Sequence, residues 1–302
     1  GKSTAEMTAV GGSQVFGTSA LGLFDDDGIT GDITEEISPV FAARLGAAFA
    51  QQYHDKIAVS GNCPAADMLA DSFSAAARSM GADVAAIPGC PVNTLRFVTA
   101  QSGFSCGVHF AVQGNSAVIR AYESDGFPPG DAAEKRLQSN FLREDFHPAD
   151  AAHIGAALPV RDARRQYDAA LDNLCGLLPG FRVSVAADDP LQRGLLLDFL
   201  LSRGAQDAPG ALDIRLDGGG ERFSIRENGR EYSYETLLLL IATEAARSGV
   251  APVYLPAGAP DLPLGSENIE VLTGDGGDTP AFRRGYRHMP YAFDNVMAAA
   301  RC

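Results

Sequence analysis

The chain has 302 residues, of which 46% are hydrophobic and 21% charged, and its formal net charge is −14. This composition predicts a globular protein of about two domains, or three small ones. The acidic balance excludes nucleic acid and anionic membrane surfaces as natural partners, because both need clustered Lys and Arg. A phosphorylated small ligand remains compatible, since it needs only a local basic pocket.

The cysteines indicate a reducing compartment. There are five of them, an odd and scattered number without a C-x-x-C pair, so we expect free thiols in a cytoplasmic protein and no zinc site. The first fifteen residues are polar and rich in Gly and Ser, without the apolar core of a signal peptide. No apolar run is long enough to span a bilayer, so we expect no membrane partner.

The first half of the chain alternates helices and strands. Residues 1–15 are expected to be a flexible lead. Ser38-Pro39 predicts the start of an amphipathic helix over 39–53, with Ser38 as N-cap. Further helices are predicted over 65–82, closed by Gly81, and 91–103, and strands over 56–61, 83–89, 106–112 and 117–126.

The second half continues this rhythm. A polar helix is predicted over 128–141, a linker over 144–160, helices over 163–178 and 190–205, and a strand over 182–189. Two further βαβ-like steps are expected in 211–255, followed by a strand, a Gly-rich loop and a terminal helix. This alternation predicts parallel or mixed sheets.

The stretch 212–240 is the most informative one, because it predicts strand, loop, strand, turn, strand and helix. Its loop, Asp217-Gly-Gly-Gly-Glu221-Arg222, has two interpretations. It is a Gly-rich hairpin turn, or it is the frame of a divalent-cation site in which Asp217 and Glu221 are the remaining carboxylates. Mg²⁺ prefers a near-octahedral set of oxygens, which two carboxylates supply poorly.

Several strings in residues 24–126 resemble one family. FDDDGITGD and the helix after it are similar to the opening of the α-D-phosphohexomutases (phosphoglucomutase/phosphomannomutase), and FGTSALG at 16–22 is a second match to that opening. KIAVSGNCPAADML, the helix closed by Gly81 and the strand CGVHFAV follow the same family to the edge of its catalytic loop.

The resemblance implies an α/β protein of three consecutive βαβ-type domains with mixed sheets, with domain two shortened and domain four absent. We expect domain I over 16–140, a shortened domain II over 141–206 and a domain III-like part over 207–302. In the family, a phosphoserine and a Mg²⁺ ion held by a D-G-D-x-D-R loop move a phosphoryl group on a hexose phosphate.

Each implied motif is altered here. Gln113 aligns with the phosphoserine, and an amide is no nucleophile. Uncharged residues, 61–64, align with a phosphate-proximal R-D-T-R string, and Gly219 and Glu221 replace two metal ligands. We therefore expect no cofactor, and Mg²⁺ only if the altered loop still binds it. His109 is expected to be a structural histidine on its strand.

A basic cluster over residues 283–288 aligns with the family's sugar loop. The resemblance suggests substrate binding by Arg283, Arg284, Arg287 and His288, and three guanidinium groups could hold a phosphate; solvated surface charge is the alternative. TGDGGD at 273–278 is interpreted as a surface turn.

Three functions remain open from the sequence. The concerted changes favour a non-catalytic phosphohexomutase-like protein with a binding, assembly or regulatory role in sugar-phosphate or polysaccharide metabolism. The alternatives are an active phosphomannomutase/phosphoglucomutase with displaced catalytic residues, and a structural subunit. We expect a homo-oligomer or hetero-complex, with a phosphorylated sugar as a possible ligand.

Overall fold

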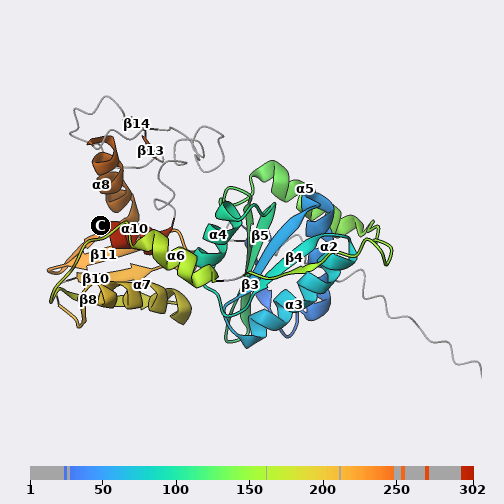
Figure 1. The fold of residues 1–302 in the computed structure, drawn as a ribbon, viewed down its shortest axis with the longest axis horizontal. Helices are drawn as coiled ribbons and strands as arrows, with labels where there is room; N and C mark the ends of the chain where they lie inside the picture. Colours follow the sequence, from blue (N-terminus) through green and yellow to red (C-terminus); the bar gives the residue numbers. More distant parts are fainter. Residues whose placement is uncertain are drawn as a thin grey trace, which may run out of the picture.

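The structure of the chain is a computed structural model. It describes residues 24–25, 28–160, 162–210, 212–247, 253–255, 269–271 and 294–302. Figure 1 shows two main bodies side by side, each with its own sheet, joined where α4 and α6 meet the second body. No helix in these ranges is long and apolar enough to cross a membrane.

The first sheet is mixed and has seven strands in the order β1-β2-β6-β5-β3-β4-β7. The pairs β5–β3, β3–β4 and β4–β7 are parallel, and the remaining pairs are antiparallel. The strands are β1 (Phe24–Asp25), β2 (Gly28–Asp32), β3 (Lys56–Gly61), β4 (Asp83–Ile87), β5 (Cys106–Gln113), β6 (Ser116–Glu123) and β7 (Ala157–Leu158).

Helices cover both faces of this sheet. The larger core packs α2, α3 and α5 against one face, and a smaller core packs α4 and the start of α6 against the other. The helices are α2 (Pro39–Tyr53), α3 (Pro64–Ser79), α4 (Val92–Gln101), α5 (Asp131–Arg143) and α6 (Ala163–Leu171).

The local signals for these helices are confirmed. Ser38 caps α2, where its hydroxyl accepts a hydrogen bond from the backbone N–H of Phe41 at 3.2 Å. Gly81 follows α3 with φ at +93°, a conformation that glycine adopts without strain. The predicted linker over 144–160 contains the short strand β7, which pairs with β4.

The second sheet has five strands in the order β12-β11-β10-β8-β9, with β10 parallel to β8 and antiparallel to β11. The expected domain boundary at 206/207 therefore falls inside one sheet. Its elements are β8 (Arg182–Ala187), α7 (Pro190–Ser202), β9 (Gln206–Asp207), β10 (Leu212–Leu216), β11 (Phe223–Glu227), β12 (Arg230–Tyr232), α8 (Tyr234–Arg247) and α10 (Asn295–Arg301).

This sheet buries one face only. Val183, Val185, Ile214 and Ile225 alternate with polar residues along their strands and form a core with α6, α7, α8 and α10. The prediction of two βαβ-like steps in 211–255 is wrong where it covers β10, β11 and β12, because these strands form an antiparallel meander. Beyond α8, β13 (Val253–Leu255) and β14 (Ile269–Val271) pair in parallel.

Candidate functional site: the joint between the two sheets

The position aligned with the phosphoserine lies on a tight hairpin. Gln113 is the last residue of β5 and pairs directly with Ser116, the first residue of β6, so only Gly114 and Asn115 form the turn. Gly114 has φ at +60°, as the first central residue of a type II′ turn requires. Gln113 and Ser116 are exposed, and the turn holds no longer loop that could carry a nucleophile into a cleft.

The neighbouring segment 61–64 is occupied with structural contacts. The side-chain oxygen of Asn62 accepts from the N–H of Val112 at 2.9 Å, and the backbone N–H of Asn62 donates to the carbonyl of Phe110. Cys63 precedes α3, where Pro64 takes the first helical position. These contacts tie the end of β3 to β5 without any cationic side chain.

The Gly-rich loop is a hairpin between β10 and β11. The N–H of Asp217 donates to the carbonyl of Arg222 at 3.0 Å, and the Asp217 carboxylate accepts the N–H of Arg222. Gly220 has φ at +80°, and a Cβ there would lie 2.6 Å from the side chain of Val92. A glycine is therefore required because the loop packs closely against α4.

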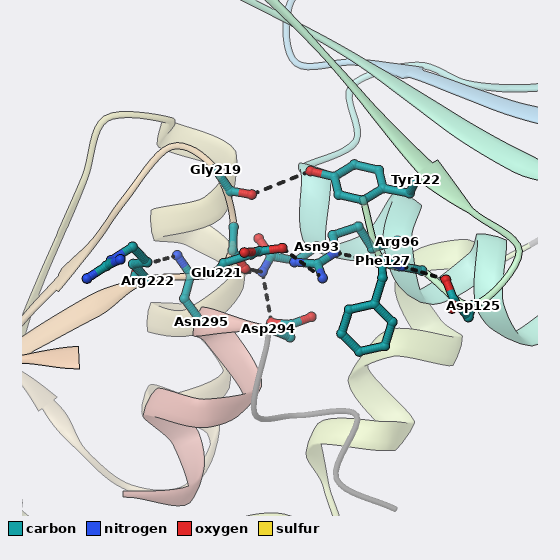
Figure 2. A network of polar contacts seen from close by, with 12 residues as sticks. Asn93, Arg96, Tyr122, Asp125, Phe127, Gly219, Glu221, Arg222, Asp294 and Asn295 are labelled. Atoms are coloured by element: carbon teal, nitrogen blue, oxygen red, sulfur yellow. Dashed lines mark hydrogen bonds and ion pairs between the residues drawn. The ribbon is translucent and has the colours of Figure 1, made fainter. Parts of the chain in front are cut away.

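Three side chains of the first body hold this loop. Asn93 donates to the carbonyl of Gly220 at 3.2 Å, and the Tyr122 hydroxyl lies 3.5 Å from the carbonyl of Gly219. The guanidinium of Arg96 lies 3.2 Å from the Glu221 carboxylate. Figure 2 shows these groups reaching the loop from one side.

Arg96 is buried at the centre of this arrangement. Its side chain is 7% exposed, its Nε donates to the carbonyl of Gly126 at 3.0 Å, and its guanidinium lies 4.9 Å from the centre of the Tyr122 ring. Burial alone would lower the pKa of Arg96, but Glu221, Tyr122 and Asp294 raise it overall. Arg96 therefore stays charged.

The contact between α4 and the loop 217–222 is called the joint here. The start of α10 also packs against it. The Asp294 carboxylate caps this helix and accepts hydrogen bonds from Tyr167 at 2.7 Å and from Asn93 at 2.8 Å. Asn295 donates to the carbonyls of Asp217 and Arg222 at 3.1 and 3.0 Å. Terminal residues thus fix both ends of the Gly-rich loop (Figure 2).

Burial governs the carboxylates of the joint. It raises the pKa of Glu221, against the opposing effect of Arg96, and it raises the pKa of Asp217 and of Asp294. The charge of Arg120, on β6, partly opposes this rise in the pKa of Asp217 and of Glu221, although burial remains the larger effect. Two guanidinium groups of the first body therefore stabilise the charged forms of the loop.

The loop does not fit a magnesium ion. Asp217 already accepts a backbone hydrogen bond and Glu221 pairs with Arg96, while Gly219 offers no side chain. Across the described ranges, no three His, Cys, Asp or Glu side chains gather closely enough to hold a metal ion. The donors present fall short of the six oxygens of a Mg²⁺ site.

A cleft opens between the loop and the first sheet. It has a volume of about 170 Å³ and presents cationic groups from Arg120 and Arg222 beside Asp217 and Glu221. Its remaining walls come from β2, α2, β6, the segment before α5, α5 itself and the loop, through Gly28, Ile29, Phe49, Ile119, Ala121, Tyr122, Pro128, Pro129, Glu134, Leu137 and Gly219. The cleft thus brings two guanidinium groups together with three carboxylates, those of Asp217, Glu221 and Glu134.

The joint contains residues that sequence reasoning missed. No sequence motif marks these residues, which are Asn93, Arg96, Asp294 and Asn295. The one local signal is Asp294, because an Asp directly before an Ala-rich helix is an N-cap signal. The predicted residues Arg283, Arg284, Arg287 and His288 lie outside the described residues.

An α/β body with a mixed sheet between two helix layers, joined to a second sheet by a D-G-x-x-x-R hairpin, defines a phosphohexomutase-like protein. Residues 22–148 match the family model described as phosphoglucomutase/phosphomannomutase, alpha/beta/alpha domain I. Residues 22–148 of the chain are therefore similar to domain I of the α-D-phosphohexomutases.

Curated relatives agree with this assignment. The chain is 25% identical over 156 residues to a phosphoglucosamine mutase of Alkaliphilus metalliredigens, and 30% identical over 156 residues to one of Sphingopyxis alaskensis. Each alignment covers 48% of this chain, and 35% and 34% of the two relatives. The chain thus spans about a third of the length of these relatives.

Solved structures show the same fold. A phosphoglucomutase/phosphomannomutase family protein of Burkholderia thailandensis matches with a TM-score of 0.73 at 15% identity, over 92% of this chain and 75% of that chain. The phosphoglucomutase pp63/parafusin of Paramecium matches with a TM-score of 0.52 at 11% identity, over 77% of this chain and 58% of that chain.

Proposed function

We propose that this chain is a non-catalytic member of the phosphohexomutase family that binds a phosphorylated sugar and serves assembly or regulation in sugar-phosphate or polysaccharide metabolism. The observation that carries the proposal is the two-residue turn between Gln113 and Ser116. Phosphoryl transfer by the family needs a phosphorylated side chain at this place, and Gln113 cannot be phosphorylated.

A second observation supports the same conclusion. Glu221, the residue at a metal-ligand position, is paired with a buried guanidinium. Phosphoryl transfer depends on positioning and on neutralising charge in the transition state, so the loss of nucleophile and metal ligands removes both contributions.

Ligand binding is supported by the cleft beside the loop. Arg120 of β6 and Arg222 of the Gly-rich loop line it, so an anionic group bound there would contact both bodies. Guanidinium groups bind phosphate oxygens bidentately. The five cysteines are free thiols, which supports a reducing compartment such as the cytoplasm.

The proposal of an assembly role does not rest on exposed strand edges. The two larger described sheets end in β1, β7 and β9, each of two residues, and in β12, of three residues. Short edge strands protect a sheet against pairing with other chains. A partner would therefore dock through another surface.

The first prediction concerns turnover. A coupled assay with glucose, mannose and glucosamine monophosphates, with a bisphosphorylated hexose and Mg²⁺ present, should show no isomerisation above the rate without protein. Intact-mass measurement should show no phosphate adduct after the same incubation. Robust turnover that survives Ser116→Ala would overturn the proposal, and turnover abolished by Ser116→Ala would identify a displaced nucleophile instead.

Binding is measured separately by isothermal titration with the same monophosphates. We expect saturable binding that Arg120→Gln weakens at least about tenfold, because one charge-assisted contact to a phosphate contributes roughly 1.5–3 kcal/mol. Arg143→Gln, on the exposed end of α5, is the control and should bind as the wild type does. Equal affinities of the two variants would contradict the assigned cleft.

A further inference from the structure

The Gly-rich loop places two carboxylates, those of Asp217 and Glu221, in the contact between the two bodies. Glu221 is two-thirds covered, with 33% of its side chain exposed, and Asp217 lies beside it on the same loop. A partly buried carboxylate needs a partner, because desolvation penalises its charged form. In the family this partner is a divalent cation, whereas here Arg96 fills that need from another body.

The side chain of Arg96 is held in place by contacts within the first body, independently of the loop. Its Nε is bound to the carbonyl of Gly126 and its guanidinium stacks over Tyr122, both within the first body. The charge is therefore presented at a defined place in the middle of α4, where it meets the Glu221 carboxylate of the loop. A preorganised guanidinium loses little entropy when it forms an ion pair.

Amide hydrogen bonds complete the contact around the ion pair. Asn93, one helical turn before Arg96, holds the carbonyl of Gly220, while Asn295 holds the two ends of the loop. Gly220 allows close approach to α4, where a side chain would collide with Val92.

We propose that the guanidinium of Arg96 takes the electrostatic place of the divalent cation, and that the loop 217–222 is a metal-independent joint that fastens the second sheet to the first body. The inference rests on the proposed non-catalytic function of the chain, since a loop without a cation cannot assist phosphoryl transfer. It assigns this loop a structural role that no motif in the sequence announces.

The test compares thermal unfolding in EDTA and in millimolar Mg²⁺. The wild type should give the same Tm in both, whereas a protein that binds a cation in its native state gains stability by mass action. Arg96→Gln should lower Tm by on the order of 5 °C, because it removes the guanidinium that is paired directly with the partly buried Glu221. The double variant Arg96→Gln/Glu221→Gln should recover part of this loss.

The matched control is Arg164→Gln. Arg164 pairs with Asp168 at 2.7 Å on the exposed side of α6, so its loss should change Tm by less than about 1 °C. If Arg96→Gln does not fold, Glu221→Gln alone is compared with the wild type by hydrogen exchange, and faster exchange confined to 217–222 and α10 is expected.

A rise in the Tm of the wild type with Mg²⁺ would overturn the inference, and so would an Arg96→Gln variant as stable as the control. Neither outcome depends on turnover. An active enzyme with a metal-independent loop would refute the proposed function alone, whereas an inactive protein stabilised by Mg²⁺ would refute this inference alone.

Discussion

At the scale of single residues, His109 illustrates how much a local pattern settles. Its place on an apolar strand predicts a structural histidine, and the residue is 1% exposed with its Nδ1 2.7 Å from the hydroxyl of Ser60. Burial, together with Arg120 on the neighbouring strand, lowers the pKa of His109 to about 3. The partner Ser60 is not predictable, because only strand pairing brings the two together.

His109 gives a prediction about pH. The unfolded chain protonates this histidine below pH 6.5, roughly, while the folded chain keeps it neutral down to about pH 3, so stability is present above 6.5 and is lost as the pH falls toward 3. The loss contributed by this one group is about 2 kcal/mol at pH 5. Urea unfolding at pH 8 and pH 5 should show His109→Gln losing that much less than the wild type.

The control for this experiment is His147→Gln, at a side chain that is 80% exposed. It should leave the pH dependence of the unfolding free energy as in the wild type. An identical pH dependence of His109→Gln and His147→Gln would show that His109 does not stay neutral in the folded chain.

At the scale of elements, the sequence signals the ends of helices strongly, but it does not show how the helices pack against each other. The cap at Ser38 and the closing Gly81 locate α2 and α3 within a few residues. Their contact depends on Gly46, in the middle of α2, where a Cβ would lie 2.2 Å from the carbonyl oxygen of Phe73. A glycine inside a helix weakens it, so this one is kept for close approach.

Two glycine-to-alanine substitutions test this packing. Gly46→Ala should destabilise the protein by about 1–3 kcal/mol or more, because α2 and α3 must separate to admit a methyl group. Gly194→Ala, in α7 with no atom within 4 Å of the new Cβ, should stabilise by up to about 1 kcal/mol through helix propensity. Urea unfolding measures the change in unfolding free energy of both variants. Changes of the same sign in the two variants would contradict close packing at Gly46.

At the scale of the whole molecule, the joint couples segments that are far apart in the chain. Asn93 is 0% exposed and contacts Gly220, Asp294 and Asn295, which are 127, 201 and 202 residues away. Its amide also accepts from Gln192 of α7. One side chain of the first body thereby links α7, α10 and the Gly-rich loop of the second.

Asn93→Ala tests this coupling. It leaves several buried polar groups without their partner, so we expect a loss of about 2–4 kcal/mol, since each such group costs roughly 1–3 kcal/mol. Hydrogen exchange should rise in α10 and in residues 217–222 but not in the strands of the first sheet. Asn173→Ala, at an exposed residue near the end of α6, is the control, and equal stability of the two variants would contradict a coupling role.

The sequence by itself determined most helices and strands of the first body, the mixed α/β class and the resemblance to domain I of the phosphohexomutases, because capping, periodicity and short strings are local properties of the chain. It also gave a hairpin at 217–222 as one of two interpretations of the Gly-rich loop, and the structure has that hairpin. Only the tertiary structure showed that the second sheet continues across residue 206 and that Arg96 faces Glu221. Such contacts form between residues whose separation in the chain carries no periodic signal, so sheet pairing and packing decide them.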